Sequence, residues 1–409
     1  MQSKTSAGQL NNNSHTTQTV VIAIFVSVLL CSIAIIIGYV IYKSIRKKGE
    51  TDTYRAVDNS INKKVLSTWN FGMMTEKYFM YNPAVYWIDD DHTQIGVISR
   101  ISGHTMRPRF MQCTSYMNLE AMKKNKILGI DPIIGLQDYL DIFGERNEGC
   151  SGIVQFKMDL LRDNQNVMAT VVNPFYSKSN ICDDKYLGFE DPRVFMMRRK
   201  PYVITYFRGK NFPYDSITNT HKMGHYLCIF PLDMSEDPLL LNYRRMRKVE
   251  KNWMPFEYEN ELYIIYSVEP HKILKVDMHT GKCKRAYETN ISTKRHKDSL
   301  GNGAPPQKIT LGNKEYFLGM AHTRDLGESE CTLVRKNFFY LFEGHPPFRI
   351  THISRTVDLT PHNPCIEFGS GLLVDQKSNT LYVANGIDDC FSSISSYPLS
   401  MVLESFEEV

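Results

Sequence analysis

Residues 188–195 read GFEDPRVF, a polar cluster with a proline that leads into an apolar run. The chain continues through a short polar turn into a second run, YVITYF, at residues 202–207. Two β-branched and aromatic runs joined by such a turn predict a β-hairpin. Proline suits the first residue of a strand, where no ladder hydrogen bond is lost. The stretch therefore predicts a strand pair whose start carries Glu190, Asp191 and Arg193.

The same pattern occurs five times along the chain. Each copy has a polar residue beside a proline, an apolar strand, a polar turn and a second strand rich in Tyr, Val and Ile. The copies start at Asn82-Pro83, Asp191-Pro192, Asn252 with Pro255, Asn302 with Pro305, and Asn363-Pro364. Only the gap between the first two is too long for one unit, and we expect it to hold an insertion with a helix around Ser115 to Lys126.

Five repeated strand units within residues 65–409 predict an all-β fold, a five-bladed β-propeller. Because blades pack around a central channel, the polar residues beside the prolines are expected to converge at one mouth of it. The alternative is that each polar residue and proline only mark the start of a strand.

Consecutive side chains on a strand face opposite ways. The sequence therefore predicts that Glu190 and Asp191 do not face each other: one faces the channel, and the other holds Arg193 or a backbone amide. A carboxyl group in a partly dry channel can be tuned to donate a proton to a leaving oxygen. The alternative is a structural ion pair at a blade corner.

The composition excludes several classes of function. Lys and Arg exceed Asp and Glu by only 48 − 44 = 4 residues, so the chain lacks the large positive charge that is typical of nucleic-acid-binding proteins. The nine cysteines include no C-x-x-C pair, so we predict no metal site and no cofactor. The chain also lacks a GxxxxGK loop, a complete GxGxxG, an HExxH and a GxSxG motif. Serine-triad hydrolysis and nucleotide binding on a doubly wound sheet are therefore unsupported.

The N-terminal part predicts a membrane anchor, with the lipid bilayer as partner. Residues 20–42 carry no charge and would span roughly 35 Å as a helix, enough for a bilayer core. A cleaved signal peptide is the alternative, but the apolar run is too long and lacks a small-residue cleavage pattern. Residues 1–19 read as a polar tail, and the charged residues 43–64 as a stem before the propeller domain, 65–409.

GFEDPRVF resembles the EDPR signature of glycoside hydrolase family 130, the β-mannoside phosphorylases and hydrolases. It equally resembles glycosyltransferase family 108, β-1,2-mannosyltransferases that share the five-bladed propeller. Four other segments resemble family motifs in the same order: Asn82-Pro83 with the strand ending in Arg100, residues 251–270, Gly303 to Pro306 with His322, and residues 368–389.

The resemblance implies that Asp191 is the catalytic acid, which reaches the glycosidic oxygen through a sugar hydroxyl. In a transferase the same carboxylate would act as base on the acceptor hydroxyl. The resemblance places sugar-pocket or supporting roles on Asn82, Arg100 and Arg193, and a distal sugar-binding acid on Asp389 or its neighbour Asp388. The expected substrate-binding set also includes Glu190, Asn252 and Trp253, of which Trp253 would either stack on a sugar face or fill the blade core.

His322 matches a position that contacts phosphate in the phosphorylases, although a satisfied histidine at a strand end is the alternative. We assign Lys251 to the same phosphate or donor site. Where the phosphorylases have a basic residue before a proline, this chain has Glu269 before Pro270, which would repel phosphate. The basic runs 243–248 and 294–297 could attract a sugar-phosphate or nucleotide-sugar donor, or simply form solvated surface.

These observations predict a membrane-anchored carbohydrate-active enzyme that acts on β-mannosides or related glycans with inversion. Glycosyl transfer is favoured, and its partners would be a glycan acceptor and a sugar-phosphate or nucleotide-sugar donor. A hydrolase or phosphorylase of the same fold is one alternative, and a non-catalytic propeller that binds glycans or proteins is another.

The predicted location is a single-pass membrane protein of the secretory pathway. Four basic residues follow the apolar run, at 43 and 46–48, and only Lys4 precedes it, so the positive-inside rule favours a cytosolic main domain. Singly anchored sugar-handling enzymes usually face the lumen, which favours the opposite orientation. The glycosylation sequons at Asn12 and Asn290 lie on either side of the span and do not decide between them.

Overall fold

A computed structural model of the chain describes most of its C-terminal five-sixths. The described residues are 57–58, 65–71, 73–75, 78–102, 126–134, 151–172, 188–209, 224–247, 250–291, 300–323, 325–326, 333–334, 336–360, 366–389 and 391–409, together with Ser32, Ile33 and Ile37. The chain divides into two units, Met1–Asp52 and Thr53–Val409.

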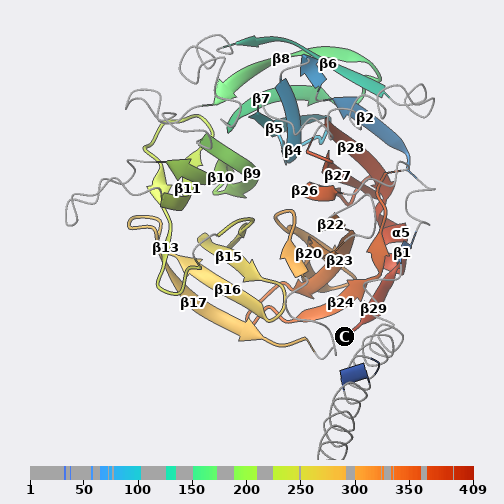
Figure 1. Cartoon of the computed structure of the whole chain (residues 1–409). Helices are drawn as coiled ribbons and strands as arrows, with labels where there is room; N and C mark the ends of the chain where they lie inside the picture. Colours follow the sequence, from blue (N-terminus) through green and yellow to red (C-terminus); the bar gives the residue numbers. More distant parts are fainter. Residues whose placement is uncertain are drawn as a thin grey trace, which may run out of the picture. The chain divides into compact units, whose positions relative to one another are not determined.

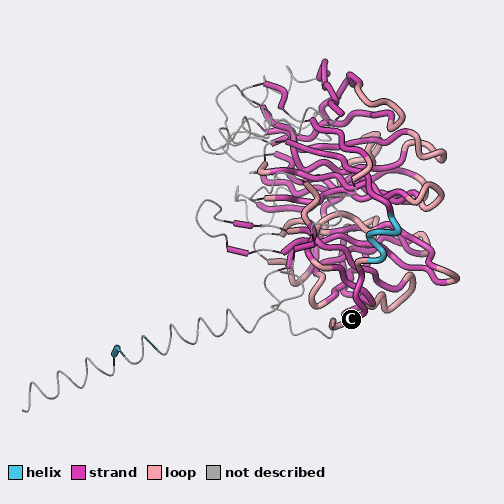
Figure 2. Tube along the Cα trace, turned by 90° about the vertical axis from the view of Figure 1, so that its right-hand side faces the viewer, coloured by secondary structure: helices cyan, strands magenta, loops and turns pink. Residues whose placement is uncertain are grey.

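In the second unit the strands gather in five groups around a common centre (Figure 1). The predicted five-bladed propeller is thereby confirmed. The first strands of three blades, β4 (Tyr78–Trp87), β9 (Gly188–Met197) and β26 (Glu367–Asp375), lie nearest the centre (Figure 1). Figure 2 shows strands throughout this unit, with α5 (Leu399–Glu404) as the one helix among its described residues.

The first three blades are antiparallel sheets built mainly from hairpins. Blade 1 contains β4, β5 (Gln94–Ser102), β7 (Ser151–Asp159) and β8 (Gln165–Val172). Blade 2 contains β9, β10 (Lys200–Gly209), β11 (Gly224–Pro231) and β12 (Leu239–Leu240). Blade 3 contains β14 (Met254–Tyr258), β15 (Glu261–Ser267), β16 (His271–Val276) and β17 (Lys282–Thr289), with β13 (Asn242–Tyr243) parallel to β17.

Blade 4 is the most branched. Its strand β20 (Lys314–Thr323) pairs with β18 (Leu300–Asn302), β19 (Gln307–Leu311) and β23 (Asn337–Glu343), and β23 pairs with β24 (Ile350–Ser354) and β25 (Thr356–Val357). The smaller strands β1 (Val57–Asp58) and β29 (Phe406–Glu408) extend this sheet, and β21 (Asp325–Leu326) pairs with β22 (Leu333–Val334). Val57 and Asp58 lie inside the predicted stem, so this part of it is paired with the propeller.

Blade 5 closes the ring. It contains β26, β27 (Thr380–Ile387) and β28 (Phe391–Pro398), and its outer strand is β2 (Ser67–Phe71) from the other end of the domain. The remaining strands are β3 (Met73–Thr75), which pairs with β4, and β6 (Lys126–Ile134), which runs parallel to β2 and β8. The closing role of β2 was not predicted.

The core consists of five apolar clusters, one at each junction between neighbouring blades. The cluster between blades 5 and 1, for example, joins Trp69 of β2 and Ile394 of β28 to Val97 of β5 and Phe156 of β7. Four further clusters join blades 1 and 2, 2 and 3, 3 and 4, and 4 and 5. Burial between blades leaves the strand starts around the centre available for polar side chains.

The predicted hairpins of the first four repeats are confirmed, but the expected place of the prolines was wrong in two of them. Asn82-Pro83 and Asp191-Pro192 lie inside β4 and β9, where the pairing with the next strand shifts register. A bulge tolerates proline because the extra residue makes no ladder bond. Residues 361–365, which start the fifth repeat, lie outside the described residues.

The expected insertion helix and the expected membrane span fall mostly on residues that the structure does not describe. The helix expected around Ser115 to Lys126 lies outside the described residues, except that Lys126 begins β6. Among the described residues, no helix is long and apolar enough to cross a membrane. Of the predicted span, only Ser32, Ile33 and Ile37 are described, and they are helical.

Candidate active site

Three of the polar residues of the repeated pattern have left-handed backbone angles. The φ angles are 53° at Asn82, 50° at Asp191 and 60° at Asn252. Asn and Asp adopt this region more readily than other residues with a side chain, because their short polar groups can hydrogen-bond locally. Such backbone strain is typical of functional sites. The three residues come from blades 1, 2 and 3.

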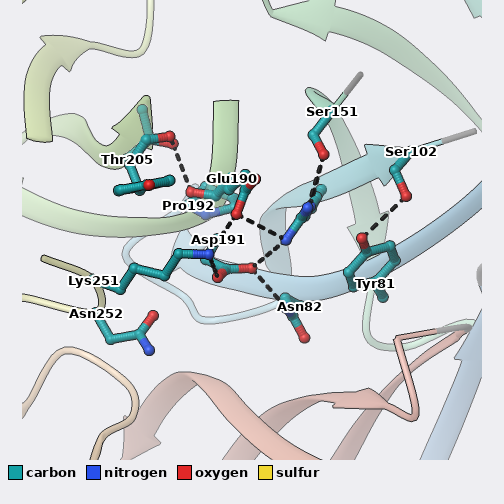
Figure 3. Close-up of polar contacts among 12 residues, drawn as sticks. Tyr81, Asn82, Ser102, Ser151, Glu190, Asp191, Pro192, Thr205, Lys251 and Asn252 are labelled. Carbon is teal, nitrogen blue, oxygen red and sulfur yellow. Dashed lines mark hydrogen bonds and ion pairs between the residues drawn. The ribbon is translucent and has the colours of Figure 1, made fainter. Parts of the chain in front are cut away.

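Glu190 and Asp191 face the same two cations, so the expectation that they point apart was wrong. Arg100 Nη1 lies 3.4 Å from Glu190 Oε2 and 3.2 Å from Asp191 Oδ1. Lys251 Nζ lies 2.6 Å from Glu190 Oε2 and 4.0 Å from Asp191 Oδ2. The left-handed φ of Asp191 interrupts the alternation of the strand and turns its carboxylate toward that of Glu190 (Figure 3).

Asn82 completes the surroundings of the Asp191 carboxylate. Its Nδ2 donates a hydrogen bond of 2.8 Å to Asp191 Oδ1, and Figure 3 shows the two side chains meeting across blades 1 and 2. Gly386 of β27 packs beneath Asn82, and a Cβ at this position would lie 1.9 Å from Asn82 Oδ1. A glycine on blade 5 thus leaves the space that Asn82 needs.

The guanidinium of Arg100 is held from its other side. Nε and Nη2 both donate to Ser151 Oγ, at 3.1 and 2.8 Å, and the guanidinium carbon lies 5.0 Å from the centre of the Tyr81 ring. The Tyr81 hydroxyl shares a 3.0 Å hydrogen bond with Ser102 (Figure 3). This support leaves Nη1 aimed at the two carboxylates.

The charges around Asp191 keep it ionised. Burial alone would raise the pKa of its carboxyl, but Arg100, Lys251, Arg193 and the hydrogen bond from Asn82 outweigh burial and hold the pKa well below its usual range. Burial would likewise lower the pKa of Arg100, and the negative groups around it raise the pKa above its usual value instead. Asp191 is therefore a carboxylate and Arg100 a cation at neutral pH.

Arg193 supports the site through backbone groups. Its side chain is 1% exposed, and burial lowers the pKa of the guanidinium to about 10. Nε donates to Gly303 O at 2.7 Å, Nη1 to Pro192 O at 2.8 Å, and Nη2 to Asn252 Oδ1 at 3.2 Å. The guanidinium carbon lies 4.9 Å from the centre of the Phe368 ring. Arg193 thus connects blades 2, 3, 4 and 5. Neither carboxylate bonds to its side chain, whereas the sequence predicted that one of them would hold Arg193 or a backbone amide.

Lys251 and Trp253 differ in exposure. The Lys251 side chain is 36% exposed, and its Nζ lies 4.7 Å from the centre of the Tyr206 ring. Trp253 is 1% exposed within the cluster between blades 2 and 3, and its indole donates to Glu250 at 3.2 Å. Because Trp253 is buried, it fills the blade core, and neither face of its ring is available to a sugar.

Asp388 and Asp389, the two candidates for the distal sugar-binding acid, have different surroundings. Asp388 is buried, and its Oδ1 accepts a 2.7 Å hydrogen bond from the Ile366 amide. Asp389 is half-buried. Burial raises the pKa of the Tyr81 hydroxyl, and the charge of Asp389 raises it further. Burial would lower the pKa of Arg100, and Asp389 is among the groups that raise it instead. Asp389 therefore lies close enough to the cluster to act on it, and it is the better candidate for the distal sugar-binding acid.

The residues considered for phosphate binding lie in different surroundings. His322, at the end of β20, is fully buried and packs edge-on against Phe368 at 5.1 Å between ring centres. Glu269 is buried in the turn after β15. His271 lies in the core between blades 3 and 4, where its Nδ1 bonds Phe348 O at 2.8 Å and burial lowers its pKa to about 4. His271 is therefore neutral at pH 7 and does not replace the basic residue that the resembling phosphorylases have before the proline.

Several residues of the site were not predicted. Ser151, Tyr81 and Ser102 lie around Arg100, and Glu250 lies beside Lys251. The position of Tyr81 directly before Asn82 was a usable signal, whereas nothing local marks Ser151. Within the part of the chain that the structure describes, no group of three or more His, Cys, Asp or Glu residues could hold a metal ion. The basic run 294–297 lies outside the described residues, and Arg244, Arg245 and Arg247 of the other run are exposed.

The fold and the site together define a five-bladed β-propeller in which Glu190 and Asp191 face the same two cations, Arg100 and Lys251. In sequence the chain is similar to "Beta-mannosyltransferase 3" of Komagataella phaffii, at 27% identity over 177 residues that cover 40% of this chain and 28% of that protein. It is also similar to "Beta-mannosyltransferase 5" of Candida albicans, at 25% identity over 280 residues that cover 53% and 45%. The chain matches less than half the length of these relatives. The predicted resemblance to β-mannosyltransferases is thus confirmed.

Comparison with solved structures finds propellers of low identity. One is MPT-4, a mannose phosphorylase from Leishmania mexicana, with a TM-score of 0.48 and 13% identity over 87% of this chain and 95% of that one. Another is MPT-1, a GDP-Man-dependent mannosyltransferase from the same organism, with a TM-score of 0.48 and 9% identity over 87% and 94%. No protein-family model matches the chain.

Proposed function

We propose that this protein is an inverting glycosyltransferase that elongates β-mannosides or closely related glycans. The observation that carries the proposal is the state of Asp191, a carboxylate held between Arg100 and Lys251 and oriented by Asn82. A group kept ionised in this way has no proton to donate, so toward a hydroxyl it can act only as the hydrogen-bond acceptor and, because its pKa is low, as a weak base.

In the proposed reaction the acceptor hydroxyl binds against Asp191 and loses its proton to the carboxylate. The hydroxyl oxygen forms the new bond to the sugar carbon of the donor, while the leaving group departs with its electron pair from the opposite face. Inversion of configuration follows from this geometry. Lys251 is the partly exposed cation of the cluster, and it would accompany the negative charge on the leaving group.

The similarity to proteins named β-mannosyltransferases supports transfer of a mannosyl group. Glu269 adds a negative charge where the resembling phosphorylases have a basic residue, which argues against inorganic phosphate as the attacking group. If water takes the place of the acceptor, the same site becomes a hydrolase.

The decisive experiment incubates the purified full-length protein with a β-1,2-manno-oligosaccharide and either GDP-mannose, mannose 1-phosphate, phosphate or buffer alone. Mass spectrometry of the sugars reads the outcome. We expect chain extension with one of the two donors, loss of extension in Asp191→Asn, and full activity in Asp233→Asn, which changes an exposed aspartate of the same blade. Cleavage in buffer or phosphate would show a hydrolase or a phosphorylase instead of a transferase. No reaction in any mixture would favour a non-catalytic propeller that binds glycans or proteins.

The proposal includes the setting of the enzyme: a single-pass protein anchored through residues 20–42, with its main domain in the secretory lumen. Asn290 lies in an exposed position directly after β17, where a glycan would meet no buried surface. A mass shift on enzymatic deglycosylation that disappears in Asn290→Gln would support the luminal placement. An unglycosylated Asn290 in the membrane-bound protein would favour the cytosolic orientation.

A further inference from the structure

Glu250 is a buried carboxylate next to the charged cluster but not part of it. Only 7% of the residue is exposed. Its Oε1 accepts from the Arg247 backbone amide at 2.5 Å and from the Tyr266 hydroxyl at 2.6 Å, and its Oε2 accepts from the Trp253 indole at 3.2 Å. A buried carboxyl group with three donors is a strong attachment point, because its two oxygens hold three separate parts of the chain at once.

The three donors come from different parts of blade 3. Arg247 precedes Glu250 in the chain, Trp253 follows it, and Tyr266 belongs to β15. Glu250 therefore ties the segment that leads into β14 to the neighbouring strand. The Trp253 and Tyr266 rings also pack edge to face at 5.4 Å, which limits the movement of the same segment.

Between these attachments stand the two residues that blade 3 contributes to the candidate active site. Lys251 follows Glu250 directly and reaches Glu190 at 2.6 Å, and Asn252 accepts from Arg193 at 3.2 Å. Lys251 has a long and partly exposed side chain, so its ammonium group is placed by the backbone that carries it. A shift of about 1 Å at such a group can cost about a hundredfold in rate.

We propose that Glu250 is the positioning residue that sets the place of Lys251 and Asn252 relative to Asp191. The inference rests on the proposed function only where its test measures activity. Glu250 does not touch the carboxylate pair in the structure and acts through the segment it anchors.

The chemistry of the three donors makes Glu250→Gln the informative substitution. A carboxylate accepts all three hydrogen bonds and donates none. The side-chain amide of glutamine has the same volume but only one oxygen. Its NH2 group must therefore face one of two sides: the Trp253 indole N–H, or the Arg247 amide together with the Tyr266 hydroxyl. Glu250→Gln therefore loosens the anchor without opening a cavity. Glu257→Gln is the matched control, because Glu257 lies at the other end of β14 and accepts the Arg198 backbone amide at 2.8 Å.

The first measurement needs no activity. Lysines of the full-length protein are labelled with trace acetic anhydride over a range of pH, and peptide mass spectrometry gives the labelling rate of each. We expect Lys251 to react several-fold faster in Glu250→Gln, because its ion pair with Glu190 loosens. Lys275, which pairs with Glu261 at 3.5 Å on the same blade, is the internal reference and should not change. An unchanged Lys251 rate in a folded variant overturns the proposal.

The second measurement is kinetic and separates positioning from general destabilisation. Glu250→Gln should lower kcat by about tenfold to a hundredfold, while Glu257→Gln stays near wild type. In a Lys251→Met background the Glu250→Gln change should add little, since the two substitutions remove the same interaction. Full additivity of the two losses would contradict action through Lys251.

Two precautions keep the outcomes separate. If Glu250→Gln fails to fold, Tyr266→Phe removes one of the three donors at constant shape and should show the same change in Lys251 labelling to a smaller degree; no change there overturns the proposal. If the wild-type protein turns over no mannoside with any donor, the proposed function fails, while the labelling experiment still decides the role of Glu250.

Discussion

Asp191 combines two features at the scale of a single residue: a left-handed backbone and a carboxylate flanked by cations. The first explains the second. In a regular strand Glu190 and Asp191 would point to opposite faces, and only one could reach Arg100. The bulge around Asp191 brings both carboxylates to one side, so each cation serves two acids.

The ionised state of Asp191 predicts a pH dependence of stability. The unfolded chain takes up a proton at Asp191 near the ordinary pKa of 3.8, whereas the folded protein keeps the carboxylate ionised below that value. The contribution of Asp191 to the free energy of unfolding is complete above the ordinary pKa and is lost as the pH falls below it. Asp191→Asn lacks this contribution. Urea unfolding should show that the wild type loses about 1 kcal/mol more than the variant between about pH 6 and pH 3. Equal losses would mean that Asp191 is not held ionised.

At the scale of the element, β27 and β4 meet where Gly386 faces Asn82. A Cβ at residue 386 would lie 1.9 Å from Asn82 Oδ1 and 2.8 Å from the Asn82 backbone nitrogen. Gly386→Ala should therefore destabilise the protein by about 1–3 kcal/mol through overpacking, and should reduce activity by displacing Asn82 from Asp191. Thermal unfolding and the transfer assay measure the two effects.

Gly312→Ala is the control for Gly386→Ala. Its Cβ would meet no atom within 4 Å, and its φ of 60° imposes only the backbone cost of a left-handed alanine, about 1 kcal/mol. Its activity should stay at the wild-type level. Adding Asn82→Ala to Gly386→Ala should recover part of the lost stability, because the clashing amide is gone. No recovery would show that the glycine does not serve Asn82.

Some of the strands and turns could be predicted from the sequence, and others could not. The hairpins of blades 1 to 4 were predictable because a strand pair with a short polar turn is a local pattern. The five repeated units led to the propeller, the EDPR stretch led to Asp191 and Arg193, and the first repeat led to Asn82. The bulges at Asp191-Pro192 and Asn82-Pro83 were not predictable, because they depend on pairing across the blade. Ser151 and Glu250 escaped for the same reason, since their partners lie far away in the sequence or on another strand.

At the scale of the whole molecule, the five core clusters form a closed series, and β2 supplies the contact between its two ends. An open array of repeats unfolds piece by piece, because each repeat contacts only its neighbours. A ring has no terminal repeat, so loss of one junction exposes two blades at once. Closure should therefore couple blade 3, on the far side of the ring, to the junction between blades 5 and 1.

Trp69→Ala tests this coupling. Trp69 on β2 is 2% exposed, packs in the cluster between blades 5 and 1, and donates through its indole to Arg162 O at 3.2 Å. Its truncation should cost about 3–5 kcal/mol. Hydrogen exchange measured by mass spectrometry should then show the slowest amides of β15 and β16 accelerating by the same factor as those of β28, because all of them exchange through one global opening. Leu161→Ala, at a residue 77% exposed, should leave every rate unchanged. Acceleration confined to blades 5 and 1 would show that the blades open independently and that β2 does not hold the ring as one cooperative unit.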